Sequence, residues 1–359
     1  MRWWDHWLKD VENGVLDGPM VQTWLQESVP PSTSYEDRPG RWVGEARWPS
    51  PHVKPSEHAL APHRIARPGE DVPEVMLEVS SPLSVGQFAG KWASYRARRT
   101  CPTTSAKGLA VSADRPVAMV AARLSDVAPD GRATRVTYGL LNLTRRDGHE
   151  EPKPMEPGQV CEVEFELNGV AQAFPAGHRF RLSLSTSYWP LAWPPPEPVT
   201  LSVHAGLSSL TLPVRPMAES DEVPANPFGQ SEGPPPLTTT ELTPPEQRWE
   251  VSRDLVAYHS ALDIVKNSGA VRYDDIDLSV TRDVHERYTW VADRFCSPVA
   301  ETEWVVTFER GDWSARSETS TRVSSTPEEF MIDACLDAYH GDRRIVSRNW
   351  HHTVPRDLI

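Results

Sequence analysis

Apolar and polar residues alternate with a period of two through much of the middle of the chain. From Cys161 to Leu167, every second residue is apolar and the residues between them are glutamates. The same alternation recurs at 180–184, 201–203 and 210–212. Since successive side chains of a strand point to opposite faces of a sheet, this pattern predicts half-buried β-strands.

Two longer apolar runs, 117–124 and 134–144, flank the stretch Ser125–Thr134. Within that stretch, Pro129 presets its own φ, Asp130 can bond to its own backbone, and Gly131 accepts a positive φ. The sequence therefore predicts a β-hairpin with a Pro-Asp-Gly turn. We expect this hairpin to lie at the centre of an antiparallel sandwich of jelly-roll type.

Helical spacing occurs near the start of the chain. Trp3, Trp4, Trp7 and Leu8 fall on one face of a helix predicted over residues 3–13, with Gly14 as its C-cap. Strands are expected at 20–25 and 76–80, with a short ordered crossing at 40–49. Three tryptophans on two turns make a heavy apolar face, so we expect another part of a larger protein to cover it.

The last hundred residues predict a second antiparallel β-domain. A hairpin is expected over 304–323, turning at Gly311 and Asp312. Apolar residues then alternate with polar ones from 330 to 339, and a turn at 340–342 leads into a last strand over 343–350. Prolines and threonines between 214 and 247 predict a stiff polar linker in front of this domain.

Composition narrows the possible partners and cofactors. The formal net charge is -13, which disfavours nucleic acid or an anionic membrane as a partner. The four cysteines are scattered without a Cys-x-x-Cys pair, so the sequence indicates no zinc site, no disulfide framework and no cofactor. We see neither a membrane span nor a signal peptide, and we expect a cytoplasmic protein.

Three motifs carry a resemblance to a known family. They are residues 124–132, residues 175–182 with Pro-Ala-Gly-His-Arg, and residues 189–194 with Trp-Pro-Leu-Ala-Trp-Pro. The chain resembles the carboxyl-terminal, non-catalytic part of the cocaine-esterase and X-prolyl dipeptidyl-peptidase family of serine hydrolases. Residues 3–8 and 45–49 are similar to the end of that family's α/β-hydrolase domain, and residues 354–359 to an extra β-domain of a bacterial branch.

The resemblance implies a mainly β architecture in four parts. Residues 1–49 would be the end of an α/β-hydrolase domain, 50–213 a jelly-roll, galactose-binding-like sandwich, 214–247 the linker and 248–359 the second β-domain. It also implies that nucleophile, acid and catalytic His lie upstream of the first helix. No catalytic, cofactor or metal residue is therefore carried over to this chain, and enzymatic activity of the chain itself is left open.

Several residues admit a functional and a structural interpretation, and we favour the structural one for each. His178 is expected to be a turn residue whose ring bonds locally. Asp126 and Asp130 are expected to serve the Pro-Asp-Gly turn rather than form an acid/base pair. Trp189 and Trp193 are expected to pack within a Pro-rich corner. If the two rings were exposed, they would instead form a sugar-stacking platform.

Two acidic clusters resemble metal sites only loosely. His149-Glu150-Glu151 are consecutive residues, which rarely converge on one ion. The cluster at 274–277 lacks the Gly and the terminal Glu of an EF-hand loop.

The segment 95–108 is basic in an acidic chain and has no periodicity. The family has a longer stretch here with several strands, so we predict missing strands and irregular structure near 91–110. Back-translated with GC-rich codons and read two bases later, residues 99–108 give Asp-Leu-Pro-Asp-Asp-Gln-Arg-Glu-Gly, an acidic run common in the family. We therefore hypothesise that about 96–108 is read out of frame in a decaying gene.

Three functions are consistent with these observations. The first is a catalytically silent remnant of a serine hydrolase. The second is one half of a split enzyme, whose separate α/β-hydrolase chain docks on Trp3, Trp4 and Trp7. The third is a stand-alone carbohydrate-binding sandwich, which requires exposed tryptophans.

Overall fold

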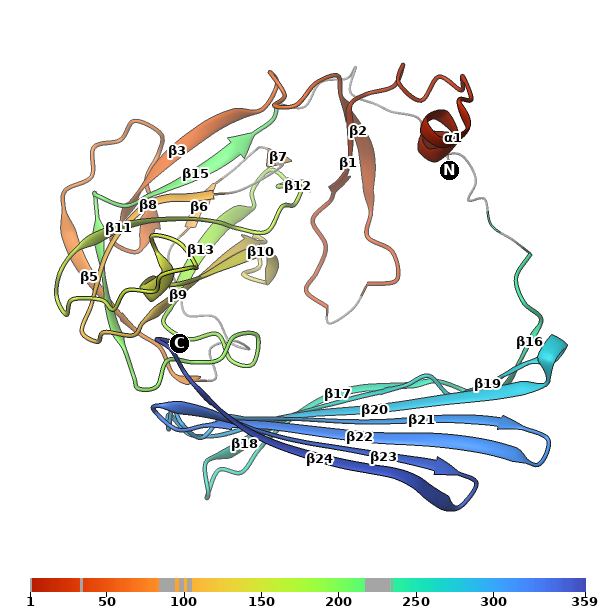
Figure 1. The fold of residues 1–359 in the computed structure, drawn as a ribbon. Helices are drawn as coiled ribbons and strands as arrows, with labels where there is room; N and C mark the ends of the chain where they lie inside the picture. The colour runs from red at the N-terminus through yellow and green to blue at the C-terminus, as the bar shows by residue number, and fades with distance from the viewer. Residues whose placement is uncertain are drawn as a thin grey trace. The chain divides into compact units, whose positions relative to one another are not determined.

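A computed structural model describes residues 2–32, 35–83, 94–96, 100–101, 105–216, 233 and 235–359, with backbone alone at 94–96, 100–101 and 105–107. It divides into two compact units (Figure 1). The first comprises residues 1–81, 88–186 and 199–232, and the second comprises 82–87, 187–198 and 233–359. Both units are built mainly from antiparallel β-strands, as the sequence predicts.

The first unit begins with one helix and continues with strands β1 to β15. The elements are α1 (Arg2–Lys9), β1 (Val21–Gln26), β2 (Gly40–Glu45), β3 (Lys54–Ala61), β4 (Arg64–Ile65), β5 (Val75–Ser80), β6 (Ser94–Arg96), β7 (Thr100–Cys101), β8 (Ser105–Ala113), β9 (Met119–Val127), β10 (Ala133–Asn142), the 3-10 turn η2 (Leu143–Arg145), β11 (Cys161–Glu166), β12 (Gln172–Ala173), β13 (Arg179–Ser185), β14 (Thr200–Ala205) and β15 (Ser209–Val214). No helix in the described part of the chain is long and apolar enough to cross a membrane.

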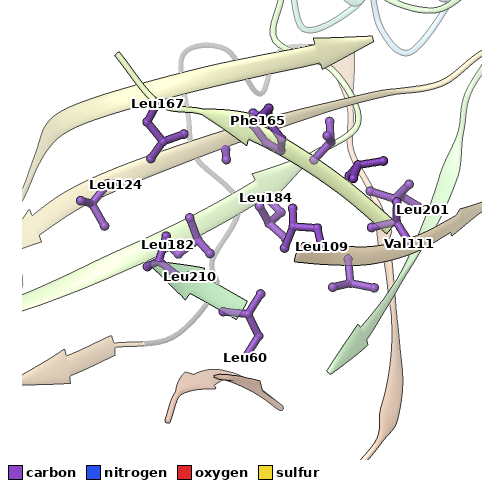
Figure 2. Packing of buried hydrophobic residues seen from close by; sticks show 14 of the residues in the cluster. Leu60, Leu109, Val111, Leu124, Phe165, Leu167, Leu182, Leu184, Leu201 and Leu210 are labelled. Carbon is purple, nitrogen blue, oxygen red and sulfur yellow. The ribbon is translucent and has the colours of Figure 1, made fainter. Parts of the chain in front are cut away.

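Two sheets of the first unit share one apolar core. One has the order β10-β9-β13-β6, and the other has the order β4-β3-β15-β8-β14-β5 with β11 paired to β8. β14 and β15 bury every second residue, whereas all nine positions of the central strand β9 are buried. Leucines, valines and phenylalanines from both sheets fill the core (Figure 2), which makes this part a β-sandwich. The jelly-roll connectivity stays a prediction.

The predicted central hairpin is confirmed. β9 and β10 pair antiparallel from Ala133↔Val127 to Asn142↔Met119, with a bulge near Arg135. Close packing requires a glycine at position 139 of β10, because a Cβ there would lie 2.4 Å from the backbone oxygen of Glu166.

A smaller sheet holds the N-terminal segment against the rest of the first unit. β1 pairs antiparallel with β2 and meets β12 in a short parallel bridge. Leu25, Val43 and Ala171 form its small core. Beside it, the buried carboxylate of Glu45 accepts from the Arg215 guanidinium, from Ser50 Oγ at 2.5 Å and from His52 Nδ1 at 3.1 Å. Glu45 and Arg215 thus clasp the end of β2 to the residue that follows β15.

The second unit is one large antiparallel sheet with a corner packed on it. Its elements are β16 (Thr239–Thr243), β17 (Glu246–Arg253), β18 (His259–Asn267), β19 (Ala270–Tyr273), the 3-10 turn η4 (Asp274–Ile276), β20 (Leu278–Val291), β21 (Val299–Arg310), β22 (Trp313–Ser325), β23 (Glu329–His340) and β24 (Arg343–Pro355). From β20 to β24, each strand pairs with the next, which confirms the predicted meander (Figure 1).

The corner 187–198 belongs to this second unit. Trp189 is 2% exposed and packs in a cluster with Leu262, Ile264 and Trp290. Arg356, also buried, donates to the Pro194 carbonyl at 2.5 Å. Burial lowers the pKa of the Arg356 guanidinium. The corner is therefore part of the sheet's core.

Three details of the sequence interpretation are wrong. The helix ends at Lys9 rather than 13, because Asp10 takes φ 53° and the Val11 N–H turns back to the Asp5 carbonyl; Gly14, expected as the cap, lies beyond it. β16 and part of β17 lie within 214–247, where a linker is predicted. The described residues near 91–110 form β6, β7 and part of β8, so irregular structure is contradicted there, while 91–93, 97–99 and 102–104 lie outside the described residues.

Candidate functional site

The turn between β9 and β10 is held by its own aspartate. Gly131 takes φ 90°, and Asp130 accepts from the Arg132 backbone N–H at 3.0 Å and from Arg132 Nε at 2.6 Å. These two hydrogen bonds lower the pKa of the Asp130 carboxyl. Asp130 therefore serves the turn, as the sequence predicts.

Asp126 and His178 form a pair that the sequence analysis does not anticipate. β13 lies antiparallel to β9, with Arg179 opposite Val127, so His178 comes beside the end of β9. His178 Nδ1 lies 2.9 Å from Asp126 Oδ1, although the two residues are 52 positions apart. The expectations that the His178 ring bonds locally and that Asp126 serves the turn are both wrong, because strand pairing brings distant segments together.

The pairing orients the ring of His178 toward a buried carboxyl group. Asp126 is 3% exposed and, as a carboxylate, can only accept a hydrogen bond. His178 Nδ1 therefore donates to that carboxylate. Asp126 Oδ2 is buried and has no hydrogen-bond partner among the described residues. The arrangement orients an imidazole, as a carboxylate does beside a catalytic or ligand-binding histidine.

A pocket of about 290 Å³ lies in front of this pair. Its walls are residues 28–31 of the β1–β2 loop, residues of the β9–β10 hairpin and His178. Thr134 Oγ1 donates to the Val29 carbonyl at 2.8 Å and fixes the loop over the hairpin. Among the described residues that line this pocket, no serine hydroxyl donates a hydrogen bond to His178, as the nucleophile of a Ser–His pair would.

The other candidate residues have structural roles. Trp189 and Trp193 contact edge to face at 4.9 Å, and Trp193 Nε1 donates to Ser325 Oγ at 3.1 Å, so they pack the corner as predicted. His149 is exposed, and its backbone carbonyl accepts from the Arg145 guanidinium at 2.5 Å. Asp274 accepts from Thr240 and Arg272. Over the described ranges, no group of three His, Cys, Asp or Glu side chains could hold a metal ion.

One stretch that the sequence analysis overlooks has the letters of a nucleophile elbow, Gly229-Gln230-Ser231-Glu232-Gly233. In serine hydrolases this pattern works because a sharp turn between a strand and a helix exposes the serine. Residues 229–232 lie outside the described residues, but the next three residues of the sequence are Pro234-Pro235-Pro236. Consecutive prolines cannot form the helix interior that an elbow requires. The letters alone therefore do not assign Ser231 as a nucleophile.

Comparison with known proteins identifies a domain family in the first unit. The model of the X-Pro dipeptidyl-peptidase C-terminal non-catalytic domain matches residues 104–223. The cocaine esterase of Rhodococcus sp. (strain MB1 Bresler) is 33% identical over 69 residues, which make up 19% of this chain and 12% of that protein. The match thus spans only a small part of this curated relative.

Two solved structures are similar at lower identity. A CocE/NonD family hydrolase from Staphylococcus aureus is 14% identical, with a TM-score of 0.49 over 60% of this chain and 44% of that chain. An aminopeptidase from the marine sediment archaeon Thaumarchaeota archaeon is 16% identical, with a TM-score of 0.48 over 60% of this chain and 43% of that chain. This chain spans less than half of either structure.

Proposed function

We propose that this chain is the C-terminal, non-catalytic part of a serine hydrolase of the cocaine-esterase and X-prolyl dipeptidyl-peptidase family, and that it supports a catalytic domain rather than supplying the nucleophile. The match of residues 104–223 to that family's C-terminal domain supports this proposal. Esters or X-Pro peptides are the substrates that such a catalytic domain would take. In this proposal, the β-sandwich is a scaffold that holds the segment 2–45 in a fixed position.

The attachment of that segment is the observation that carries the proposal. The β1–β2 loop is fixed to the hairpin by Val29 and Thr134, and the end of β2 is fixed by Glu45 and Arg215. Between these points, Arg38 donates to Gln172 Oε1 at 3.0 Å. Anchors at both ends of a short hairpin restrict its motion more than a single contact would. Each anchor removes conformational freedom that the other anchor alone would leave to the backbone. A scaffold needs such a rigid connection.

Hydrolysis by the purified chain tests the proposal directly. We expect no turnover of a p-nitrophenyl ester or an X-Pro p-nitroanilide above the buffer rate. A Ser231→Ala variant, which removes the one serine in a Gly-x-Ser-x-Gly pattern, is the matched control. Hydrolysis that the wild-type chain performs and Ser231→Ala loses would overturn the proposal, because the chain would then carry its own nucleophile.

A separate catalytic chain is a second candidate, favoured by the exposure of α1. Trp3, Trp4 and Trp7 are 51%, 58% and 54% exposed, and the rings of Trp3 and Trp7 lie 5.8 Å apart. Large exposed aromatic side chains gathered on one helix are typical of a docking face. We propose that an α/β-hydrolase chain covers this face when catalytic and scaffold parts are encoded separately.

Mixing experiments test this second candidate. Esterase activity should appear when the chain is combined with the product of a neighbouring hydrolase gene, and Trp3→Ser with Trp7→Ser should abolish it. Trp249→Ser, which changes an equally exposed tryptophan of the second unit, should leave it intact. Equal activity of both variants would rule out docking through α1. Trp189 is buried, which argues against carbohydrate binding, because that function requires an exposed platform of tryptophans.

A further inference from the structure

The last strand of the second unit, β24, forms an open edge of its sheet (Figure 1). Among the described residues it pairs only with β23, and all 13 of its positions are exposed. Edge strands are commonly protected by being short, by a bulge or by a proline. The bulge of β24 lies before Val346, and its proline is Pro355, so neither interrupts residues 346–354. The backbone N–H and C=O groups on the outer side of this segment are therefore open to another strand.

The side chains of residues 346–354 follow a similar order in both directions from Trp350. Positions at equal distances from Trp350 carry side chains of similar size or polarity, in the pairs Val346 and Val354, Ser347 and Thr353, Arg348 and His352, and Asn349 and His351. When two identical strands pair antiparallel, residues at equal distances from the two-fold axis lie opposite one another. A second copy of β24, with the axis at Trp350, would thus match each side chain with a similar one.

The same arrangement would join the apolar faces of the two sheets. Val346, Trp350 and Val354 are 39%, 44% and 44% exposed, and they share one face because they are four residues apart. Val354 lies opposite Phe330 of β23, whose ring contacts the ring of Trp193 in the corner. A two-fold axis perpendicular to the sheet keeps this face on the same side in both copies. Valine would then pack on valine across the axis, and the two copies of Trp350 would pack on each other.

Other registers fit these side chains less well. Moving the axis by one residue in either direction places Trp350 opposite Arg348 or His352. Moving it by two residues toward the start of β24 places Arg348 opposite its own copy, and like charges directly opposite are destabilising. With the axis at Trp350, the two copies of Arg348 lie roughly 14 Å apart, at about 3.4 Å per residue and 4.8 Å between strands, which exceeds a Debye length of about 8 Å.

We propose that two copies of this chain associate through β24, antiparallel and with the two-fold axis at Trp350, so that two sheets become one. An antiparallel pair over 346–354 forms about nine backbone hydrogen bonds, roughly one per residue, close to the ten or so of a typical protein interface. The proposal is independent of the support function, since it needs neither a catalytic domain nor the tryptophans of α1.

Sedimentation velocity of the full chain over a range of concentrations, at pH 8 where an ordinary imidazole is uncharged, tests the association. We expect a monomer–dimer equilibrium. Trp350→Glu should weaken it roughly 10-fold or more, because it places two carboxylates opposite each other at the axis. Trp304→Glu is the matched control, since Trp304 is 41% exposed but lies on β21, whose two edges are already paired. This variant should associate as wild type.

Cysteine substitutions test the register. Trp350→Cys should form a disulfide-linked dimer under mild oxidation, because directly opposite residues have Cα atoms about 4.5–5.5 Å apart, within the reach of a disulfide. Arg348→Cys alone should not cross-link, but it should do so when mixed with His352→Cys. Unfolding curves check that Trp350→Glu folds, and the cross-linking result stands if it does not.

A monomer at every concentration would overturn the proposal, as would a dimer that Trp350→Glu leaves intact. Equal weakening by Trp304→Glu and Trp350→Glu would also overturn it, since that result would indicate that the sheets pack face to face. The other open edge, β17, is exposed at all 8 positions. Pairing of β24 with β17 of a second copy would not close, so a series of species larger than a dimer would contradict the two-fold arrangement.

Discussion

Removing Arg215 leaves a buried carboxylate without its cation. Glu45 is 6% exposed and Arg215 is 7% exposed, so neither is stabilised by much water. Loss of one partner of a buried ion pair costs about 3–5 kcal/mol, because the remaining charge stays desolvated. In Arg215→Met, Glu45 keeps only the neutral donor Ser50 and the ring of His52. We therefore expect the free energy of opening the β1–β2 hairpin to fall by about 3–5 kcal/mol.

The effect should be confined to the hairpin that the clasp holds. Opening of β1 and β2 then becomes about 100- to 4,000-fold more frequent, since each 1.4 kcal/mol is a factor of ten. Amide hydrogen exchange of peptides that cover 20–45 measures this local opening. Lys153→Met, which breaks an exposed ion pair with Asp147 in the same unit, is the control and should leave exchange unchanged.

The pH dependence gives a second readout of the same clasp. Burial raises the pKa of Glu45, but hydrogen bonds from Ser50, Arg215 and His52 outweigh it, so the pKa is lowered from its ordinary 4.5. A lowered folded-state pKa means that the clasp stabilises the fold above about pH 4.5 and that this stability is lost as pH falls further. Arg215→Met should therefore show a shallower loss of stability between pH 5 and 3. Exchange within threefold of wild type, with an unchanged acid slope, would refute the reasoning.

Three further substitutions test other parts of the fold. His178→Ala should lower the free energy of unfolding by about 1–3 kcal/mol in denaturant titration, because it leaves the buried Asp126 unpaired; an unchanged midpoint would mean that water replaces the ring at no cost. Arg356→Met should destabilise the second unit by a similar amount, since a buried backbone carbonyl loses its donor, and the change is measured as earlier exposure of the corner tryptophans by fluorescence. Gly139→Ala should cost about 1–3 kcal/mol because its Cβ meets backbone at 2.4 Å; a neutral effect in thermal unfolding would show that β10 and β11 can move apart.

Much of the strand content could be predicted from the sequence because it depends on local periodicity. The alternation at 161–167 and the Pro-Asp-Gly turn are properties of neighbouring residues, and β11 and the β9–β10 hairpin follow from them. Local signals were weaker at ends of elements. The left-handed conformation of Asp10 ended α1 before the glycine that a capping rule would choose.

The candidate site could not be predicted in the same way. The sequence places Asp126 in one turn motif and His178 in another. Nothing in the sequence indicates that these two residues, 52 positions apart, lie in contact. The pairing of β13 with β9 puts them together.

The sequence by itself determined the class of the fold, the meander of the second unit and the motifs that lie within the match of residues 104–223 to the X-Pro dipeptidyl-peptidase C-terminal domain. These rest on side-chain period and turn chemistry, which act over a few residues. Only the tertiary structure decided that Trp189 is core and not a sugar platform, that Glu45 meets Arg215, and that Asp126 holds His178. Burial and ion pairing depend on which distant segments pack together, and that is set by the whole fold.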